Sequence, residues 1–259
     1  MSIDPDVVLP RDAPSPRAAW RGLVAAATEP YRDAGNFAWH YARGKLTFDP
    51  VFRHLLSTGD IPSHARLLDL GCGQGLLASL LATCDRAAAT GAWPHAWAPP
   101  PRAVRVVGIE RMARDVARAR AALGTQAGVT ADFICGDMRE VAFPAADVAV
   151  ALDSLHYVPI PDQDRMLLRL RAALGRDGRL LLRIADAGGG DRYARSQRVD
   201  WLVTRLRGHR VAPTFCRPVA AWTARLAELG FSTRARPMSG LLPFANTLLV
   251  ARVADGASP

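Results

Sequence analysis

The stretch RLLDLGCGQGLLASLLA, residues 66–82, ends an apolar run in glycines at alternate positions and continues as a leucine-rich helical pattern. A strand, a glycine turn and a helix in this order are typical of a nucleotide-like ligand site. Gly71, Gly73 and Gly75 follow G-x-G-x-G, and Leu76 stands next, whereas a dinucleotide fingerprint requires G-x-G-x-x-G. No Gly-Lys-Ser/Thr follows, which excludes a Walker phosphate loop. The turn therefore predicts a ligand without phosphates.

Strands and helices alternate around this turn. We predict strands over residues 66–70, 103–110, 131–137, 146–153, 178–186, 231–237 and 246–253. The alternation up to about residue 185 favours a parallel sheet with helices on both faces. The connection RPMSGLLPFAN is too short for a crossover helix, so the last two strands are expected to pair antiparallel. The expected fold is a Rossmann-like three-layer α/β sandwich with a seven-stranded, mostly parallel sheet and an antiparallel last strand.

The chain divides into a helical N-terminal cap or lid, residues 1–60, and an α/β domain, residues 61–259. The first 16 residues, rich in Pro and Asp, are expected to be frayed. Residues 87–102 hold four prolines and two tryptophans, which predicts a surface insertion. Residues 187–215 are expected to form a basic segment on the substrate side, so the cap and this segment together would enclose the substrate.

The composition, with 259 residues, 49% hydrophobic and 22% charged, indicates a globular protein. No apolar run approaches the roughly 18 residues of a membrane span. The start MSIDPDVVLP has two aspartates and no basic cluster, unlike a secretory signal, so a cytoplasmic location is expected. No two of the four cysteines lie within ten residues of each other, so they are expected to be buried or half-buried thiols and not a zinc site.

The net charge of +9 is concentrated in one segment. Residues 162–236 hold 16 arginines against 7 acidic residues, and Lys45 is the single lysine of the chain. Such a segment suits an acidic partner: nucleic acid, a lipid surface or an acidic carrier protein. Residues 192–210 place an apolar face between arginines, which fits a substrate lid, a membrane surface, a carrier-docking helix or an ordinary packed helix.

Acidic residues stand at three predicted strand ends. Asp69, before the first glycine, suits a ligand with a positive charge. Glu110 ends the second strand, where a carboxylate accepts both hydroxyls of a ribose. Asp137 ends the third strand, where a carboxylate accepts from an exocyclic amine. A cation, a ribose and an adenine without phosphate describe S-adenosylmethionine, which is the expected cofactor.

The sequence resembles the class I S-adenosylmethionine-dependent methyltransferases over roughly residues 62–253. The resemblance is carried by LLDLGCGQG, VVGIE, CGDM, ADVAVALDSLHYV and LLRLRAALGRDGRLLLRI, in this order. It implies that the methionine part of the cofactor is lined by Asp69, Gly71, Cys72, Gly73 and Gly75. It further implies a ribose contact for Glu110 and adenine contacts for Arg111 or Met112, Asp137 and Met138. Asp153 would lie near the reactive end of the cofactor.

The run Asp153-Ser154-Leu155-His156-Tyr157 follows the fourth predicted strand. It lacks the Asn/Asp-Pro-Pro-aromatic run of enzymes that methylate exocyclic amines, and it is similar to small-molecule methyltransferases. Asp153, His156 and Tyr157 are the candidate catalytic residues. His156 could act as a base, since its ordinary pKa lies near neutrality, or it could pack beneath the site while positioning alone catalyses the reaction.

The run FAWHYARGKLTFDP precedes the first strand. Tyr41, Arg43 and Lys45 could supply a cation for the carboxylate of the cofactor, or the run could form an aromatic-packed cap. The predicted function is methyl transfer to a small or carrier-linked organic molecule, of aryl or polyketide type in bacterial secondary metabolism. The alternatives are an RNA or other nucleic-acid methyltransferase, which the missing Pro-Pro-aromatic run disfavours, and a non-catalytic cofactor-binding protein.

Overall fold

A computed structural model describes residues 14–124, 130–188, 190, 214–238 and 246–254. The basic stretch 192–210 lies outside these residues, and so do residues 1–13 of the start that is expected to be frayed. The N-terminal part comprises α1 (Pro16–Thr28), the short 3-10 helix η1 (Glu29–Arg32), α2 (Asn36–Phe48) and α3 (Pro50–Ser57). Within the described part of the chain, no helix is both long enough and apolar enough to cross a lipid bilayer.

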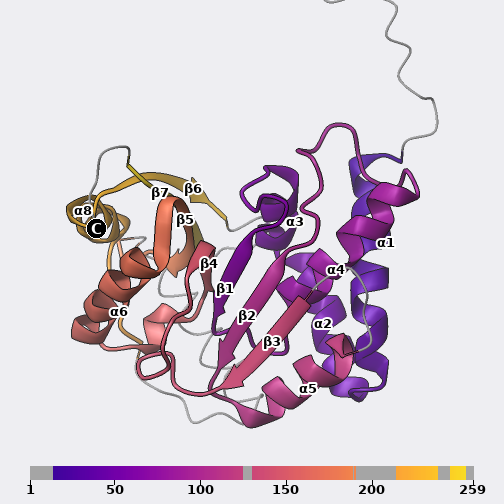
Figure 1. The fold of residues 1–259 in the computed structure, drawn as a ribbon, viewed down its shortest axis with the longest axis horizontal. Coiled ribbons are helices and arrows are strands. Elements are labelled where there is room, and N and C mark those ends of the chain that lie inside the picture. The colour runs from indigo at the N-terminus through magenta and orange to yellow at the C-terminus, as the bar shows by residue number, and fades with distance from the viewer. Residues whose placement is uncertain (1–13, 125–129, 189, 191–213, 239–245, 255–259) are drawn as a thin grey trace, which may run out of the picture.

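The remaining elements form an α/β domain. They are β1 (Arg66–Leu70), α4 (Leu76–Ala89), β2 (Arg105–Glu110), α5 (Ala113–Leu123), β3 (Thr130–Cys135), β4 (Ala146–Leu152), η2 (Leu155–Tyr157), α6 (Ile160–Ala173), β5 (Leu174–Ala185), α8 (Val219–Glu228), β6 (Phe231–Pro237) and β7 (Asn246–Val253). Figure 1 shows the strands side by side with helices packed around them.

The strands form one seven-stranded sheet in the order β3-β2-β1-β4-β5-β7-β6. The pairs from β3 to β5 are parallel, and β7 runs antiparallel to both β5 and β6. This confirms the predicted fold class and the antiparallel pairing of the last two strands. Because the chain reverses strand order between β1 and β4, the carboxyl ends of these two strands open a site for a ligand.

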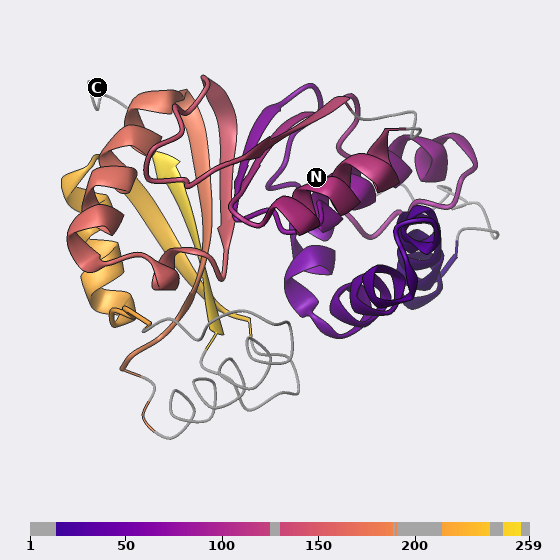
Figure 2. The ribbon, with the colours of Figure 1, turned by 90° about the horizontal axis from the view of Figure 1, so that it is seen from below.

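Helices cover both faces of the sheet (Figure 2). One face packs against α1 to α5 through a core that includes Leu67, Val106 and Val150. The other packs against α6 and α8 through residues such as Leu68, Ala149 and Trp222. The alternation along β1 and β4 follows from the two-residue period of a strand and explains why both strands are mostly apolar, since each packs against helices on both faces.

The N-terminal helices share their core with the sheet. Trp20 and Leu23 of α1 belong to the same buried cluster as Leu67 and Val106 of the strands. The sequence interpretation expected a helix ending near Pro30 and another beginning at Asp49, and it did not anticipate α2 between them. The glycine and the aromatic residues of α2 weaken its helical pattern, while its buried residues Ala38, Ala42 and Leu46 follow a four-residue spacing.

The insertion differs in part from the prediction. Helix α4 continues to Ala89, and the loop after it exposes His95 at the surface. Its tryptophans turn inward, however: Trp93 is buried and its Nε1 donates to the carbonyl of Ala98 at 2.9 Å. The rings of Trp93 and Trp97 meet edge to face at 5.3 Å, and Trp97 lies 6.4 Å from Trp20 of α1. The loop therefore closes the core over α1.

Trp93→Ala tests this packing. We expect it to lower the free energy of unfolding by about 3–5 kcal/mol, because it removes a buried ring and leaves a cavity. His95→Ala, an exposed change in the same loop, is expected to alter stability by less than about 0.5 kcal/mol. Urea unfolding followed by circular dichroism measures both. Equal stabilities of the two variants would show that the loop is not part of the core.

Candidate functional site

The glycine turn after β1 is held by its neighbours on both sides. Gly71 has a φ of 75°, and its N–H donates to the carbonyl of Ile109 at 2.8 Å. The hydroxyl of Ser154, after β4, donates to the carbonyl of Leu70 at 2.8 Å. A Cβ on Gly71 would lie 2.5 Å from the Cβ of Ser154, so only glycine fits here.

The N-terminal helices anchor the same turn. The Nε2 of buried Gln74 donates to the carbonyl of Ala38 at 2.8 Å, and the hydroxyl of Tyr31 donates to the carbonyl of Gln74 at 2.7 Å. Burial raises the pKa of Tyr31, so its hydroxyl keeps its proton and remains a donor. The sequence did not single out Tyr31 or Gln74, because their role depends on contacts about 40 positions apart.

Gly73 and Gly75 differ in their surroundings. Both have left-handed backbones, with φ of 56° and 77°. A Cβ on Gly75 would meet Phe133, Ala119 and Leu123 at 3.0–3.1 Å, so this glycine serves the packing of α4 against its neighbours. A Cβ on Gly73 would meet no described atom within 4 Å. The side of Gly73 on which a Cβ would lie is therefore open in the described part of the chain.

Glu110 links this turn to the next. It ends β2 as predicted, and its Oε2 accepts from the N–H of Gly73 at 3.0 Å while its Oε1 accepts from the N–H of Met112 at 2.8 Å. Each carboxylate oxygen retains capacity for a further donor. The carboxylate is therefore oriented in advance at the edge of the sheet, in a geometry that suits a vicinal diol.

Asp69 lies beneath the turn, on β1. It is buried, and burial followed by the charge of Glu110 raises its pKa to about 7. A positive ligand charge nearby would offset both effects and favour the ionised carboxylate. Cys72 is also buried, and burial raises the pKa of its thiol, so it contributes packing against Gly108 and not a thiolate.

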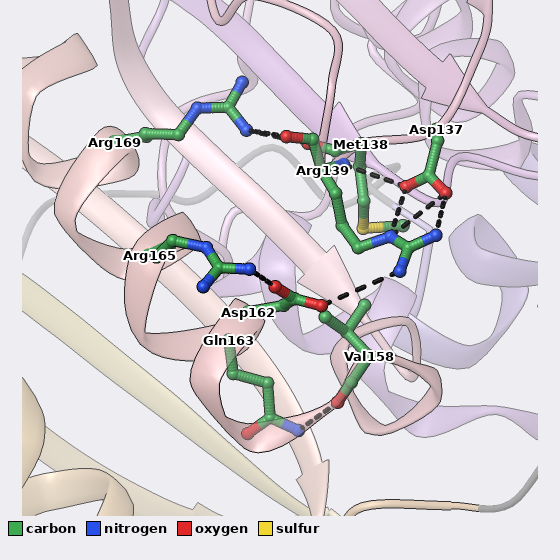
Figure 3. Close-up of polar contacts among 8 residues, drawn as sticks. All are labelled: Asp137, Met138, Arg139, Val158, Asp162, Gln163, Arg165 and Arg169. Atoms are coloured by element: carbon green, nitrogen blue, oxygen red, sulfur yellow. Dashed lines mark hydrogen bonds and ion pairs between the residues drawn. The ribbon is translucent and has the colours of Figure 1, made fainter.

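The loop after β3 is fastened to α6. Asp137 accepts from the guanidinium of Arg139, at 2.6 Å from Nη2 to Oδ2, and these bonds lower the pKa of Asp137. Arg169 donates to the carbonyl of Met138 at 3.2 Å, and Figure 3 shows both arginines reaching this loop. Asp137 therefore uses part of its acceptor capacity within the protein, and Met138 packs beside the core on the α6 face. Arg111 is exposed.

A cluster of four charged side chains lies at the carboxyl ends of β4 and β5, and we call it the charge quartet: Lys45, Asp49, Asp153 and Arg183. The Nζ of Lys45 lies 2.8 Å from Asp49 Oδ2 and 3.5 Å from Asp153 Oδ2. Arg183 reaches both carboxylates. The structure thus brings the predicted residues Lys45 and Asp153 together, with Asp49 and Arg183 as partners that the sequence interpretation missed.

Signals for these two residues were present in the sequence. Asp49 lies four positions after Lys45, the spacing of an ion pair on a helix, and directly before a proline. Arg183 interrupts the apolar run of its strand. A charge in such a run is rarely buried without a partner. By contrast, Arg43 is exposed, and its guanidinium lies 5.5 Å from the ring centroid of Trp39.

The turn η2 carries His156 and Tyr157. Buried Gln163 holds this turn, because its Nε2 donates to the carbonyls of Leu155 at 3.1 Å and Val158 at 2.8 Å. His156 is buried, burial lowers its pKa, and among the described residues its Nε2 has no hydrogen-bond partner. Its ring centroid lies 4.1 Å from that of Tyr157, which is exposed. The neutral imidazole can thus accept a proton.

Metal chemistry has no candidate centre in the described part of the chain. No group of three or more His, Cys, Asp or Glu side chains there is placed to hold a metal ion. The polar groups that converge at the carboxyl edge of the sheet instead fit an organic cation with a ribose: an open glycine backbone, an oriented carboxylate at Glu110 and a buried carboxyl at Asp69.

The fold is that of the class I S-adenosylmethionine-dependent methyltransferases. A family model described as a methyltransferase domain matches residues 38–235. The chain therefore belongs to the methyltransferase domain family, enzymes that take a methyl group from S-adenosylmethionine, their cofactor.

Individual relatives agree with this membership. The chain is 33% identical to a nocamycin O-methyltransferase of Saccharothrix syringae over 140 residues, which cover 54% of this chain and 44% of that protein. The match thus spans less than half of the curated relative. Among solved structures, a magnesium protoporphyrin IX methyltransferase of Synechocystis PCC 6803 with bound SAH is similar with a TM-score of 0.54 and 19% identity, covering 93% of this chain and 100% of the other. An O-methyltransferase family protein of Burkholderia thailandensis is similar with a TM-score of 0.55 and 17% identity, covering 93% of this chain and 70% of the other.

Asp69 predicts a pH dependence of stability. Its pKa rises from 3.8 in the unfolded chain to about 7 in the folded one. Between these values the folded protein holds a proton that the unfolded chain has released, so the free energy of unfolding falls as the pH rises from about 4 to about 7. Asp69→Asn is expected to remove this slope, at most about 1.4 kcal/mol per pH unit. Urea unfolding at several pH values measures it.

Asp132→Asn, at an exposed position of β3, is the matched control and should keep the slope of the unchanged protein. If Asp69→Asn and the unchanged protein lose stability equally over this range, Asp69 is not the group that takes up the proton.

Proposed function

We propose that this enzyme methylates a small organic molecule, free or attached to an acidic carrier protein, and that the acceptor is of aryl or polyketide type. The observation that carries the proposal is the match to a nocamycin O-methyltransferase, a relative named for a small-molecule product. The Leu155-His156-Tyr157 run after β4 supports it, since it replaces the Pro-Pro-aromatic run of enzymes that methylate exocyclic amines. The nucleic-acid and non-catalytic alternatives have no comparable support among the relatives.

For the cofactor, we assign the methionine part to the turn from Gly71 to Gly75, which includes Cys72, and to Asp69. The ribose lies on Glu110, and the adenine lies near Arg111, Asp137 and Met138. S-adenosylmethionine supplies an activated methyl group on a sulfonium centre. The protein must therefore align the acceptor and, for a hydroxyl, remove its proton.

For the acceptor, we assign proton removal to His156 Nε2, which is buried and lacks a hydrogen-bond partner within the described residues. Tyr157 and Asp153 flank it along the chain. We assign the acceptor side to the cap, residues 1–60, and to residues 187–215, of which 1–13, 189 and 191–213 lie outside the described residues. Exposed aromatic side chains on the cap, such as Phe48, would face an apolar acceptor. Lys45 and Arg43 remain candidates for binding the carboxylate of the cofactor.

A cytoplasmic location and an acidic carrier complete the proposal. The four cysteines are all described and none forms a disulfide, as is usual in a reducing compartment. The arginine excess of residues 162–236 would attract an acidic carrier surface.

Gly73→Ala tests where the cofactor lies. Gly73 and Gly91 both have positive φ, and a Cβ at either would meet no described atom within 4 Å. Each substitution is therefore expected to cost a similar 1–2 kcal/mol or so of stability through the left-handed backbone alone. Gly73→Ala should also weaken S-adenosylmethionine binding at least about tenfold in calorimetry, because its methyl group occupies the ligand face. Equal affinities for the two variants would place the cofactor elsewhere.

Labelled S-adenosylmethionine identifies the acceptor. Incubation with a panel of hydroxylated aromatic and polyketide compounds, some on acyl carrier protein, should label one of these and not RNA. His156→Gln should then lower kcat about 100-fold or more, because a general base is lost, with unchanged cofactor affinity. Exposed His95→Gln is the control and should leave kcat unchanged. Labelling of RNA alone, or an undiminished kcat in His156→Gln, would overturn the assignment.

A further inference from the structure

Arg183 is the centre of the charge quartet. Its side chain is 1% exposed, and its Nε donates to Asp153 Oδ1 at 2.8 Å while its Nη2 donates to Asp49 Oδ2 at 2.7 Å. Nη1 bonds a second oxygen of Asp49, and Nη2 a second oxygen of Asp153. A buried guanidinium is tolerated only when its donors are paired. One planar fork thus fixes two carboxylates that come from different parts of the fold.

Asp153 is held in an unusual conformation. Its φ is 56°, in the left-handed region that residues other than glycine seldom adopt, and its N–H lies 3.3 Å from the carbonyl of Arg183. Such backbones persist where their surroundings over-determine them, and they concentrate at functional sites. Asp153 leads directly into the turn that carries His156. Arg183 therefore sets the direction in which the chain leaves β4.

Asp49 supplies the anchor on the other side. Its Oδ1 accepts from the N–H of Val51 at 3.1 Å, so it caps the start of α3. The same carboxylate meets Arg183 and Lys45, whose charges hold its pKa below the usual range against the effect of burial. The junction of α2 and α3 is consequently tied to the sheet at the point where β4 ends.

The quartet also balances charge next to His156. Asp153 raises the pKa of His156 and Arg183 lowers it, while burial gives the largest effect and lowers it. The other neighbour described for the imidazole is the ring of Tyr157. With two cations and two carboxylates the quartet is neutral as a whole. Removal of a single member leaves a net charge close to the imidazole, with a sign set by the member removed.

We propose that Asp49 and Arg183 are positioning residues for methyl transfer. Acting through Asp153, they orient the turn that carries His156, and they keep the net charge near its imidazole at zero. The inference rests on the proposed function, because only there does His156 accept a proton from the acceptor. Neither residue needs to touch the cofactor or the acceptor. Their effect reaches the reaction through the orientation and the proton affinity of His156.

Opposite changes of charge test the proposal. Asp49→Asn keeps an N-cap residue on α3 and leaves the quartet positive, so the pKa of His156 should fall. Arg183→Gln leaves the quartet negative, so the pKa should rise; each shift is expected to be about one pH unit. The double variant is neutral again and should return toward the unchanged protein. Imidazole signals in nuclear magnetic resonance titrations measure this, with His156→Gln identifying the signal among six histidines.

A purely structural role predicts another pattern. If the quartet only stabilised the fold, both single variants would lower stability and would shift the His156 signal in one direction or not at all, which would overturn the proposal. Arg66→Gln is the control: it breaks an exposed ion pair with Asp147 at the opposite end of β1 and should leave the pKa of His156 unchanged. If Arg183→Gln fails to fold, Lys45→Gln makes the same change of charge at a half-exposed side chain.

These titrations need neither cofactor nor acceptor, so they separate this inference from the proposed function. Once an acceptor is known, Arg183→Lys keeps the charge but loses the planar fork. It should lower kcat at least about tenfold while the KM for S-adenosylmethionine and the pKa of His156 stay near those of the unchanged protein. Unchanged kcat in Arg183→Lys would contradict the aiming role, and failure to find any methylated acceptor would contradict the proposed function instead.

Discussion

The carboxylate of Glu110 binds two backbone amides that belong to different turns, and the ligand edge of the sheet depends on this pair of bonds. Through Gly73 it fixes the turn after β1, and through Met112 it fixes the start of α5. An acidic side chain that already accepts two amides has its remaining lone pairs directed, so a diol that bound there, as proposed above, would meet oriented acceptors without reordering the protein. The same bonds hold Gly73 of the glycine turn next to Glu110, at the carboxyl end of β2.

The N-terminal helices also hold the glycine turn in place. Tyr31 and Gln74 tie α2 and η1 to the glycine turn, while Asp49 ties the α2–α3 junction to β4 and β5. The N-terminal helices thus share both the core and the polar bonds of the sheet. Their separate status as a lid, residues 1–60, stays a prediction, whereas their contribution to the site follows from these bonds.

The sequence predicted the fold well because its signals are local. A strand, three glycines and a leucine-rich helix lie within 17 residues, and the two-residue and four-residue periods of the later elements are clear. The parts that sequence reasoning missed depend on contacts between distant positions. The prolines around Trp93 and Trp97 predict a surface loop, yet Trp93 packs against Trp97, whose ring meets that of Trp20 in α1, 77 positions earlier. Asp49 and Arg183, 134 positions apart, show no sign of each other in the sequence. The roles of the individual site residues remain predictions for the same reason.

The raised pKa of Asp69 has a consequence for the order of events at the site. The methyl donor carries a positive sulfonium, and the product that remains after transfer has a neutral sulfur. If Asp69 lies beside the methionine part of the donor, as proposed above, its carboxyl, whose pKa is raised to about 7, is expected to ionise beside the donor and to take up a proton beside the product. Loss of the methyl group would then be accompanied by proton uptake at Asp69, and product affinity would rise relative to donor affinity as the medium becomes more acidic. Asp69 would in this way distinguish the methyl donor from its demethylated product by the charge on the sulfur.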